Sequence, residues 1–115
     1  MSYLLLIMEP NGQRAARTPE QGTQAYQSMV DFAANLKARG LLRATESLRA
    51  GGTRVSIRDG KRTSIDGPFA EAKELVGGFF LVDCETHEQA IAIAAECPAA
   101  AWATVEVREL GPCFA

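Results

Sequence analysis

The sequence predicts an α+β fold in which helices pack on one sheet, and three observations lead to that class. Residues 3–8 form a continuous apolar run, and residues 79–84 are apolar except for Asp83, which is the pattern of strands at the centre of a sheet. Two segments with helical periodicity each open with a capping box. Shorter alternating stretches lie between them and are separated by glycine turns. The 115 residues, 47% hydrophobic and 23% charged, fit a single packed domain over residues 1–115.

The first helix is predicted to begin after Thr18 and to end at Gly40. Thr18 can cap the helix, Pro19 suits the first helical position, and Gln21 completes the capping box. Gly40 favours the left-handed conformation that stops a helix. The apolar positions that repeat at helical spacing are Ala25, Met29, Phe32 and Leu36.

The middle of the chain predicts a strand followed by a hairpin. Residues 42–49 alternate as a strand does, with Glu46 on the apolar face. After a Gly51-Gly52 break, residues 53–58 and 61–65 are expected to pair around an Asp59-Gly60 turn. Residues 70–76 have the composition of one or two helical turns. The Gly77-Gly78 pair that follows is interpreted as a break through which the chain enters the next strand.

The last third of the chain predicts a helix and a final strand. Thr86 and Gln89 form the second capping box, and Pro98 ends the helix. Beyond a connector of small residues, Val105 and Val107 alternate with charged residues as in a strand. The order of elements is then strand, helix, strand, inserted hairpin, strand, helix, strand. This is a ferredoxin-like split βαβ arrangement with an inserted β-hairpin.

Composition argues against several partners and cofactors. Twelve Lys and Arg against 14 Asp and Glu give a net charge of −2, and the basic residues are scattered, so no nucleic-acid partner is expected. The apolar runs are too short to cross a membrane, and a cytoplasmic protein with no membrane partner is predicted. One histidine and three unclustered cysteines predict no metal and no cofactor. Cys84 and Cys97 are expected in the core and Cys113 at the surface.

Two helices can cover only one face of the predicted sheet. The apolar side chains on the other face therefore need a partner, and a second copy of the chain is the economical one. A homodimer is expected.

The stretch Asp66-Gly67-Pro68-Phe69, followed by Gly77-Gly78 and an apolar strand, resembles the signature of the YCII-related proteins of the DGPF type. The resemblance extends over nearly the whole chain. It implies a protomer of the dimeric α+β barrel superfamily, in which two sheets face each other across a two-fold axis. Some DGPF-type members are associated with extracytoplasmic-function sigma factors, which implies a regulatory setting.

The sequence departs from the classical YCII members at one point that matters for mechanism. The resemblance to those members implies a His–Asp pair with the histidine on the first helix. Here the first helix has no histidine, and His87, the only one, opens the second helix as an expected surface residue. This departure argues against histidine-based acid–base chemistry.

Two carboxylates are the candidate catalytic groups. Asp66 is either a general base in a cleft, with its direction fixed by Gly67 and Pro68, or an acceptor that holds its own turn. Glu46 is either an acid that faces inward from the apolar side of its strand, or a residue turned to solvent by a bulge near Gly51.

The candidate ligand-binding residues are Lys73, Glu74, Phe69 and Tyr3. For Lys73 and Glu74 the alternative is a solvated charged face. For Tyr3, and for Trp102 in the small-residue connector, the alternative to a pocket or a dimer seam is core packing.

Two classes of function follow from these residues. The first is a binding protein or enzyme for a small polar organic molecule, with a carboxylate-lined cleft at the dimeric barrel. The second is a non-catalytic dimeric regulatory or interaction module. The sequence shows no nucleophile with an adjacent base and no cofactor motif, so whether the protein is an enzyme stays open.

Overall fold

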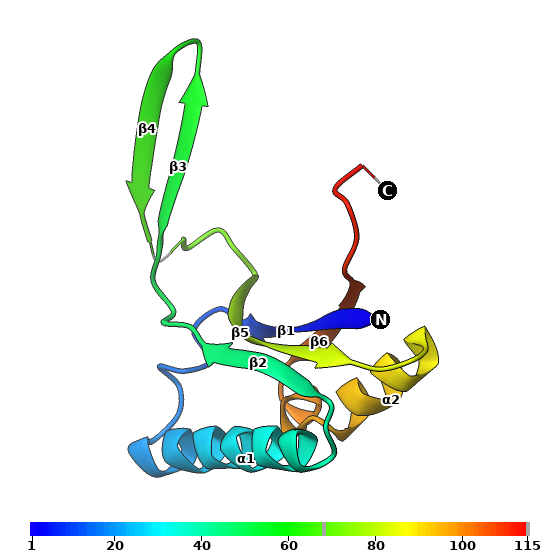
Figure 1. The fold of residues 1–115 in the computed structure, drawn as a ribbon. Helices are drawn as coiled ribbons and strands as arrows, with labels where there is room; N and C mark the ends of the chain where they lie inside the picture. The colour runs from blue at the N-terminus through cyan, green and yellow to red at the C-terminus, as the bar shows by residue number, and fades with distance from the viewer. Residues whose placement is uncertain (68, 115) are drawn as a thin grey trace.

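Four strands form one antiparallel sheet in the order β2-β5-β1-β6 (Figure 1). The structure is a computed structural model that describes residues 1–67 and 69–114. The strands are β1 (Ser2–Pro10), β2 (Leu42–Ser47), β5 (Glu74–Asp83) and β6 (Thr104–Glu109). The two apolar runs are the central strands β1 and β5, as their composition predicts.

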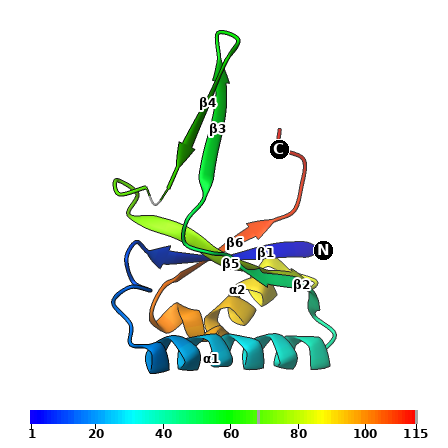
Figure 2. The ribbon, with the colours of Figure 1, turned by 90° about the vertical axis from the view of Figure 1, so that its left-hand side faces the viewer.

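Both helices lie on the same face of this sheet (Figures 1 and 2). They are α1 (Pro19–Ala38), between β1 and β2, and α2 (His87–Glu96), which is followed by a short 3₁₀ helix over Pro98–Ala101 and then β6. Both predicted capping boxes are present, at Thr18 and at Thr86. The predicted α+β class and the ferredoxin-like arrangement are confirmed.

The core lies between the sheet and the helices. Along β1 every second residue from Tyr3 is buried, and these residues face α1 and α2. The ring of Phe32 from α1 meets Phe80 of β5 edge to face, with centroids 5.1 Å apart. The other buried hydrophobic residues of the core are Leu5, Ile7, Leu36, Val82, Cys84, Ala90, Ile93, Ala94, Cys97 and Ala99.

The predicted hairpin forms a separate two-stranded sheet of β3 (Thr53–Arg58) and β4 (Lys61–Asp66). It projects from the face of the main sheet that is opposite the helices (Figures 1 and 2). Asp59 and Gly60 have φ of 54° and 75°, which are the two positive values of a type I′ turn. At the base of the hairpin, the Gly67 amide donates to the Gly52 carbonyl at 2.7 Å.

The prediction of helical turns over residues 70–76 is wrong, because a turn leads directly into β5, which begins at Glu74. Gly77 and Gly78 therefore lie inside the strand. A Cβ on Gly77 would overlap the carboxylate of Glu9, and a Cβ on Gly78 would lie 2.8 Å from the Glu46 carbonyl oxygen. The glycine pair serves the close approach of neighbouring groups rather than a break before the strand.

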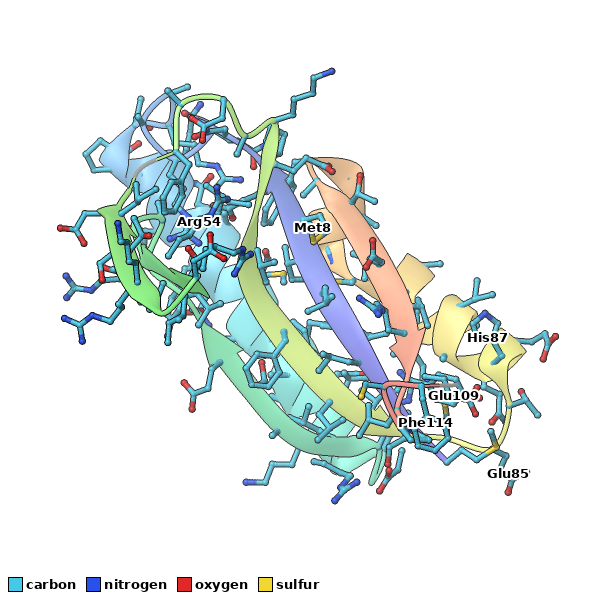
Figure 3. The ribbon with its side chains drawn as sticks, turned by 90° about the horizontal axis from the view of Figure 1, so that it is seen from above. Met8, Arg54, Glu85, His87, Glu109 and Phe114 are labelled. Atoms are coloured by element: carbon cyan, nitrogen blue, oxygen red, sulfur yellow. The ribbon has the colours of Figure 1, made fainter. Side chains whose placement is uncertain are left out.

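The face of the sheet away from the helices is named here the open face (Figure 3). It carries Leu4, Leu6 and Met8 of β1, which alternate with the buried residues and are half-buried. In the β1–β5 register, Leu81 and Phe79 pair with Leu4 and Leu6. The described part of the chain thus covers one face of the sheet with helices and leaves an apolar strip on the other.

Candidate functional site

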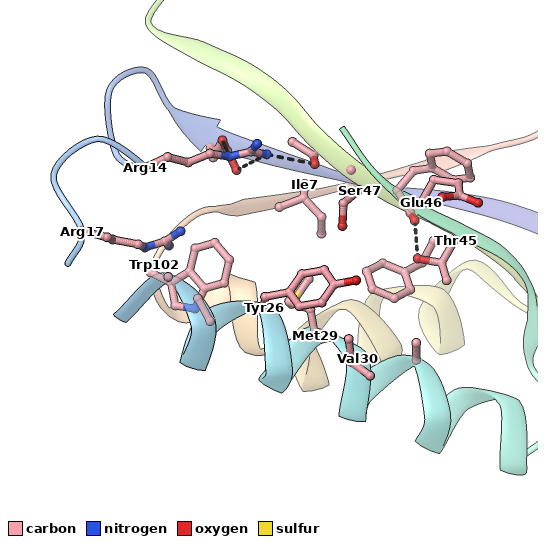
Figure 4. Close-up of a pocket in the computed structure, with 18 residues that line it drawn as sticks. Ile7, Arg14, Arg17, Tyr26, Met29, Val30, Thr45, Glu46, Ser47 and Trp102 are labelled. Atoms are coloured by element: carbon pink, nitrogen blue, oxygen red, sulfur yellow. Dashed lines mark hydrogen bonds and ion pairs between the residues drawn. The ribbon is translucent and has the colours of Figure 1, made fainter. Parts of the chain in front are cut away.

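A cleft of about 390 Å³ lies between α1 and the sheet (Figure 4). The helix packs closely at its C-terminal half, where Phe32 and Leu36 are buried. Nearer its N-terminus, Met29 is half-buried and Tyr26 is 61% exposed. The apolar positions of α1 thus extend toward its N-terminus beyond the part of the helix that packs on the sheet. The cleft is the space left between this end of the helix and the sheet.

A buried ion pair forms one wall of the cleft. Glu9 is the last inward-facing residue of β1, and its side chain is 5% exposed. Arg14 Nε lies 2.6 Å from Glu9 Oε1, Arg14 Nη2 lies 3.3 Å from Oε2, and Nη2 also donates to the Gly77 carbonyl at 3.2 Å. Two contacts from one guanidinium compensate the burial of the carboxylate. Gly77 leaves the room for this pair, since any side chain there would occupy the position of the carboxylate.

A second cation lies at the same end of the cleft. The Arg17 guanidinium carbon is 4.4 Å from the centre of the Trp102 ring (Figure 4). Gln13 joins the two residues, because its amide donates to the Trp102 carbonyl at 2.5 Å and accepts from Arg17 Nη2 at 3.4 Å. Among residues 1–67 and 69–114, Arg17 makes no salt bridge. The cleft therefore has one neutralised cation, Arg14, and one cation without a carboxylate.

The cleft has an apolar middle and a polar end. Both oxygens of Glu9 face Arg14, so this carboxylate holds the arginine in place. Within the described ranges, no group of three or more His, Cys, Asp or Glu side chains is arranged to hold a metal ion. No helix of the described residues has the length and apolar character needed to span a membrane.

Asp66 and its neighbours lie outside the cleft. Asp66 Oδ1 accepts a hydrogen bond from Thr53 Oγ1 at 2.7 Å, across the base of the hairpin. This contact matches the interpretation of Asp66 as an acceptor that holds the local backbone, although the donor is a side chain and not a turn amide. Pro68, expected to help fix the direction of Asp66, lies outside the described residues.

The loop that precedes β5 contains Phe69 and Lys73, and Glu74 is the first residue of β5. The Arg54 guanidinium carbon lies 3.7 Å from the centre of the Phe69 ring. Asn11 fastens the loop, because its side-chain amide donates to the carbonyls of Phe69 and Ala72 and its backbone amide donates to that of Lys73. Lys73 and Glu74 are exposed.

Glu46 reaches the rim of the cleft as part of β2, but its register position is on the open face. It pairs with Phe79, which in turn pairs with Leu6 of that face, and it is exposed. A register shift lies between Leu42 and Ala44, rather than near Gly51. Leu42 pairs with the buried Val82 and so lies on the face of the sheet that the helices cover. Because of the register shift, Ala44 and Glu46 lie on the open face.

Tyr3 lies toward the other end of the sheet and is 1% exposed. Its ring centre is 5.7 Å from that of His87, which is exposed, as the sequence predicts. Burial, and then the nearby carboxylate of Glu109, raise the pKa of the Tyr3 hydroxyl. The structure thus places Tyr3 in core packing, away from the cleft and from Asp66. Trp102, in contrast, lines the cleft.

Sequence reasoning missed Glu9, Arg14 and Arg17. The signal for Glu9 was present, because it continues the alternation of Tyr3, Leu5 and Ile7 and so puts a carboxylate on the core face. The same argument selected Glu46, but the first strand was predicted to end before Glu9. The two arginines lie in an irregular connection, where residue spacing does not predict contacts.

The split βαβ sheet, the two helices on one face and the inserted hairpin define an α+β protein of ferredoxin-like fold. The chain belongs to the YCII-related domain family, whose model matches residues 1–113. None of the curated proteins matches the chain in sequence.

Proposed function

We propose that this protein binds a small organic molecule in the cleft between α1 and the sheet. The observation that carries the proposal is the cleft itself, of about 390 Å³, with apolar walls and a few fixed polar groups at one end. Ligand sites in proteins commonly have this size and this lining. The carboxylate that lies within the cleft is that of Glu9, which binds Arg14, and the predicted Asp66, Lys73 and Glu74 do not line it.

A thermal-shift screen of small organic molecules tests the proposal, because a ligand that binds only the native state raises the melting temperature. We expect compounds that stabilise the wild-type protein to lose their effect in Ala25→Phe, whose ring would fill the cleft. Ala34→Phe is the matched control, because Ala34 lies on the same helix and is exposed outside the cleft. Stabilisation that persists in Ala25→Phe would place the ligand elsewhere. A screen without any stabilising compound would favour the regulatory or interaction module.

A homodimer is the second part of the proposal, and the open face supports it. Leu4, Leu6 and Met8 form an apolar strip that lacks a cover within the described chain. Three hydrophobic residues of the hairpin, Val55, Ile57 and Ile65, are exposed, although a lone two-stranded hairpin is at best marginally stable in water. Leu110 and Phe114 of the C-terminal segment are exposed too.

A second copy is the occupant that fits these surfaces together. The hairpin and the C-terminal segment rise from the same side of the sheet, so they flank the open face (Figures 1 and 2). Two copies related by a two-fold axis would each cover the strip of the other, with hairpins and tails around the seam. Such an interface is expected to bury more than about 1,000 Å².

Sedimentation velocity at micromolar protein tests the dimer. We expect the wild type to sediment as a dimer and Leu6→Lys as a monomer, because a buried lysine on the seam would lack a partner. Ala34→Lys adds the same charge on an exposed helix position and should remain dimeric. A compact wild-type monomer would overturn this part of the proposal and leave the cleft unaffected.

A further inference from the structure

We infer that the cleft selects a small organic anion, a carboxylate with an apolar body, and that Arg17 is the group that recognises its charge. The inference rests on the proposed function, since it names the class of ligand for the same cleft. It depends on the difference between the two arginines at one end of the cleft.

Arg14 and Arg17 have opposite electrostatic states. Arg14 is neutralised by Glu9 through contacts of 2.6 and 3.3 Å, and it also donates a hydrogen bond to the Gly77 carbonyl. Arg17 has one neutral partner, the amide oxygen of Gln13 at 3.4 Å. Because Glu9 and Arg14 cancel and the register puts Glu46 on the open face, the charge left at this end is that of Arg17.

Neighbouring side chains hold the Arg17 guanidinium in place at the end of the cleft. It stacks on Trp102 at 4.4 Å, and Trp102 is fixed through its carbonyl by Gln13 (Figure 4). A stacked guanidinium keeps its N–H groups in the plane of the fork, where a carboxylate accepts two of them. The α1 N-terminus begins two residues beyond Arg17, at Pro19, and its dipole also favours an anion there.

The rest of the cleft fits an apolar body. Met29 and Ile7 form its inner wall, and Tyr26 and Val30 stand along its rim with 61% and 41% exposed. A bound hydrocarbon chain or aromatic ring would cover these side chains. The arrangement thus separates a cationic end from an apolar channel, as an amphipathic carboxylate requires.

Matched pairs of acids and amides test the inference. Phenylacetate, benzoate and hexanoate would each be titrated beside phenylacetamide, benzamide and hexanamide, near neutral pH. The emission of Trp102, the only tryptophan in the chain, reports binding next to Arg17. We expect at least one acid to bind at least about tenfold more tightly than its amide, the difference that one charge-assisted contact supplies.

Variants of Arg17 then assign the preference. Arg17→Gln should remove the difference between acid and amide, and Arg17→Lys should retain part of it, because the charge remains while the stacked fork is lost. Arg58→Gln, which removes the same charge at the hairpin, is the control and should behave as wild type.

The outcomes separate the inference from the proposed function. Equal binding of acid and amide, or a preference that survives Arg17→Gln, would overturn the anion inference while the cleft remained a ligand site. Absence of binding by every acid would also overturn it. The proposed function would then be decided by the Ala25→Phe comparison in the thermal-shift screen, which does not depend on ligand charge.

Discussion

Gly77 shows how one residue determines the chemistry of the cleft, since its missing side chain is the space in which Glu9 and Arg14 meet. We expect Gly77→Ala to lower the free energy of unfolding by about 2 kcal/mol, because the added methyl group must displace a buried ion pair. Urea denaturation measures the change. Gly22→Ala is the control: nothing lies within 4 Å of a Cβ at Gly22, and alanine should stabilise α1 by up to about 1 kcal/mol. Equal effects of both substitutions would contradict this account.

The Glu9–Arg14 pair makes its own prediction. Arg14→Met leaves a buried carboxylate without its partner and should destabilise the protein by about 3 kcal/mol. Arg14→Met combined with Glu9→Gln should be less destabilising than Arg14→Met alone, because no buried charge then remains. A double-mutant cycle from urea midpoints measures this coupling. Additive effects would mean that the two side chains do not depend on each other.

The three cysteines should react differently. Cys84 and Cys97 are buried, as the sequence predicts, whereas Cys113 is exposed. Burial raises the pKa of the Cys84 and Cys97 thiols, so both remain protonated as well as covered at neutral pH. We expect iodoacetamide to modify Cys113 in the native protein and all three thiols after unfolding, with peptide mass spectrometry as the readout. Rapid native modification of Cys97 would contradict the packing described.

The same thiols give stability a dependence on alkaline pH. A thiol whose pKa is higher in the folded than in the unfolded state favours folding fully below the unfolded pKa. The advantage is lost as pH rises from there through the folded pKa. The urea concentration at the unfolding midpoint should therefore decrease as the pH rises above about 9, the ordinary pKa range of a thiol. When the urea midpoint of each protein is compared with its own midpoint at pH 7, Cys97→Ala should show a smaller decline than the wild type. Cys113→Ala should show the same decline as the wild type.

At the scale of elements, the base of the hairpin separates two roles for Asp66. If Asp66 serves mainly to accept from Thr53, Asp66→Asn retains an acceptor and should cost little, whereas Asp66→Ala should cost on the order of 1 kcal/mol. Thr53→Ala should cost a similar amount and add little to Asp66→Ala. If Asp66 instead acts on a ligand, Asp66→Asn should melt as wild type and lose the response to any compound that the thermal-shift screen identifies.

The elements that the sequence predicted have strong local causes. Thr18, Thr86 and the Asp59-Gly60 turn act through contacts with near neighbours in the chain, so their residue types are enough to place both helices and the hairpin. Residues 70–76 were misread because alanine, lysine and glutamate favour a helix. There, Asn11, far away in the sequence, fixes the loop carbonyls instead, and pairing with β1 draws the chain into β5.

The cleft was not predictable in the same way. Its polar end joins Glu9 of β1, two arginines of the following connection, Gly77 of β5 and Trp102. These residues meet only because the split βαβ topology brings the ends of distant elements to one side of the sheet. Composition shows that charged and aromatic residues are present, but it does not show which of them pair and which remain without a partner.

At the scale of the molecule, the hairpin is built as an insert whose ends meet at the Gly52–Gly67 hydrogen bond. Replacing residues 53–66 with an Asn-Gly turn should leave the main sheet and both helices folded, since β3 and β4 pair only with each other. We expect circular dichroism to show a cooperative melt and sedimentation to show weaker dimerisation. Loss of folding would mean that the hairpin is needed to stabilise the fold of its own protomer. An unchanged dimer would mean that the hairpin is not part of the dimer interface.

The central position of β1 has a consequence for biosynthesis. β1 leaves the ribosome before both of the strands that flank it, because Tyr3 pairs with Val82 of β5 on one side and with Glu109 of β6 on the other. At about 5–20 residues per second, synthesis of the intervening chain takes on the order of 10 s. For that time the apolar residues 3–8 have no sheet to join. Slowing translation is therefore expected to lower the soluble yield rather than raise it.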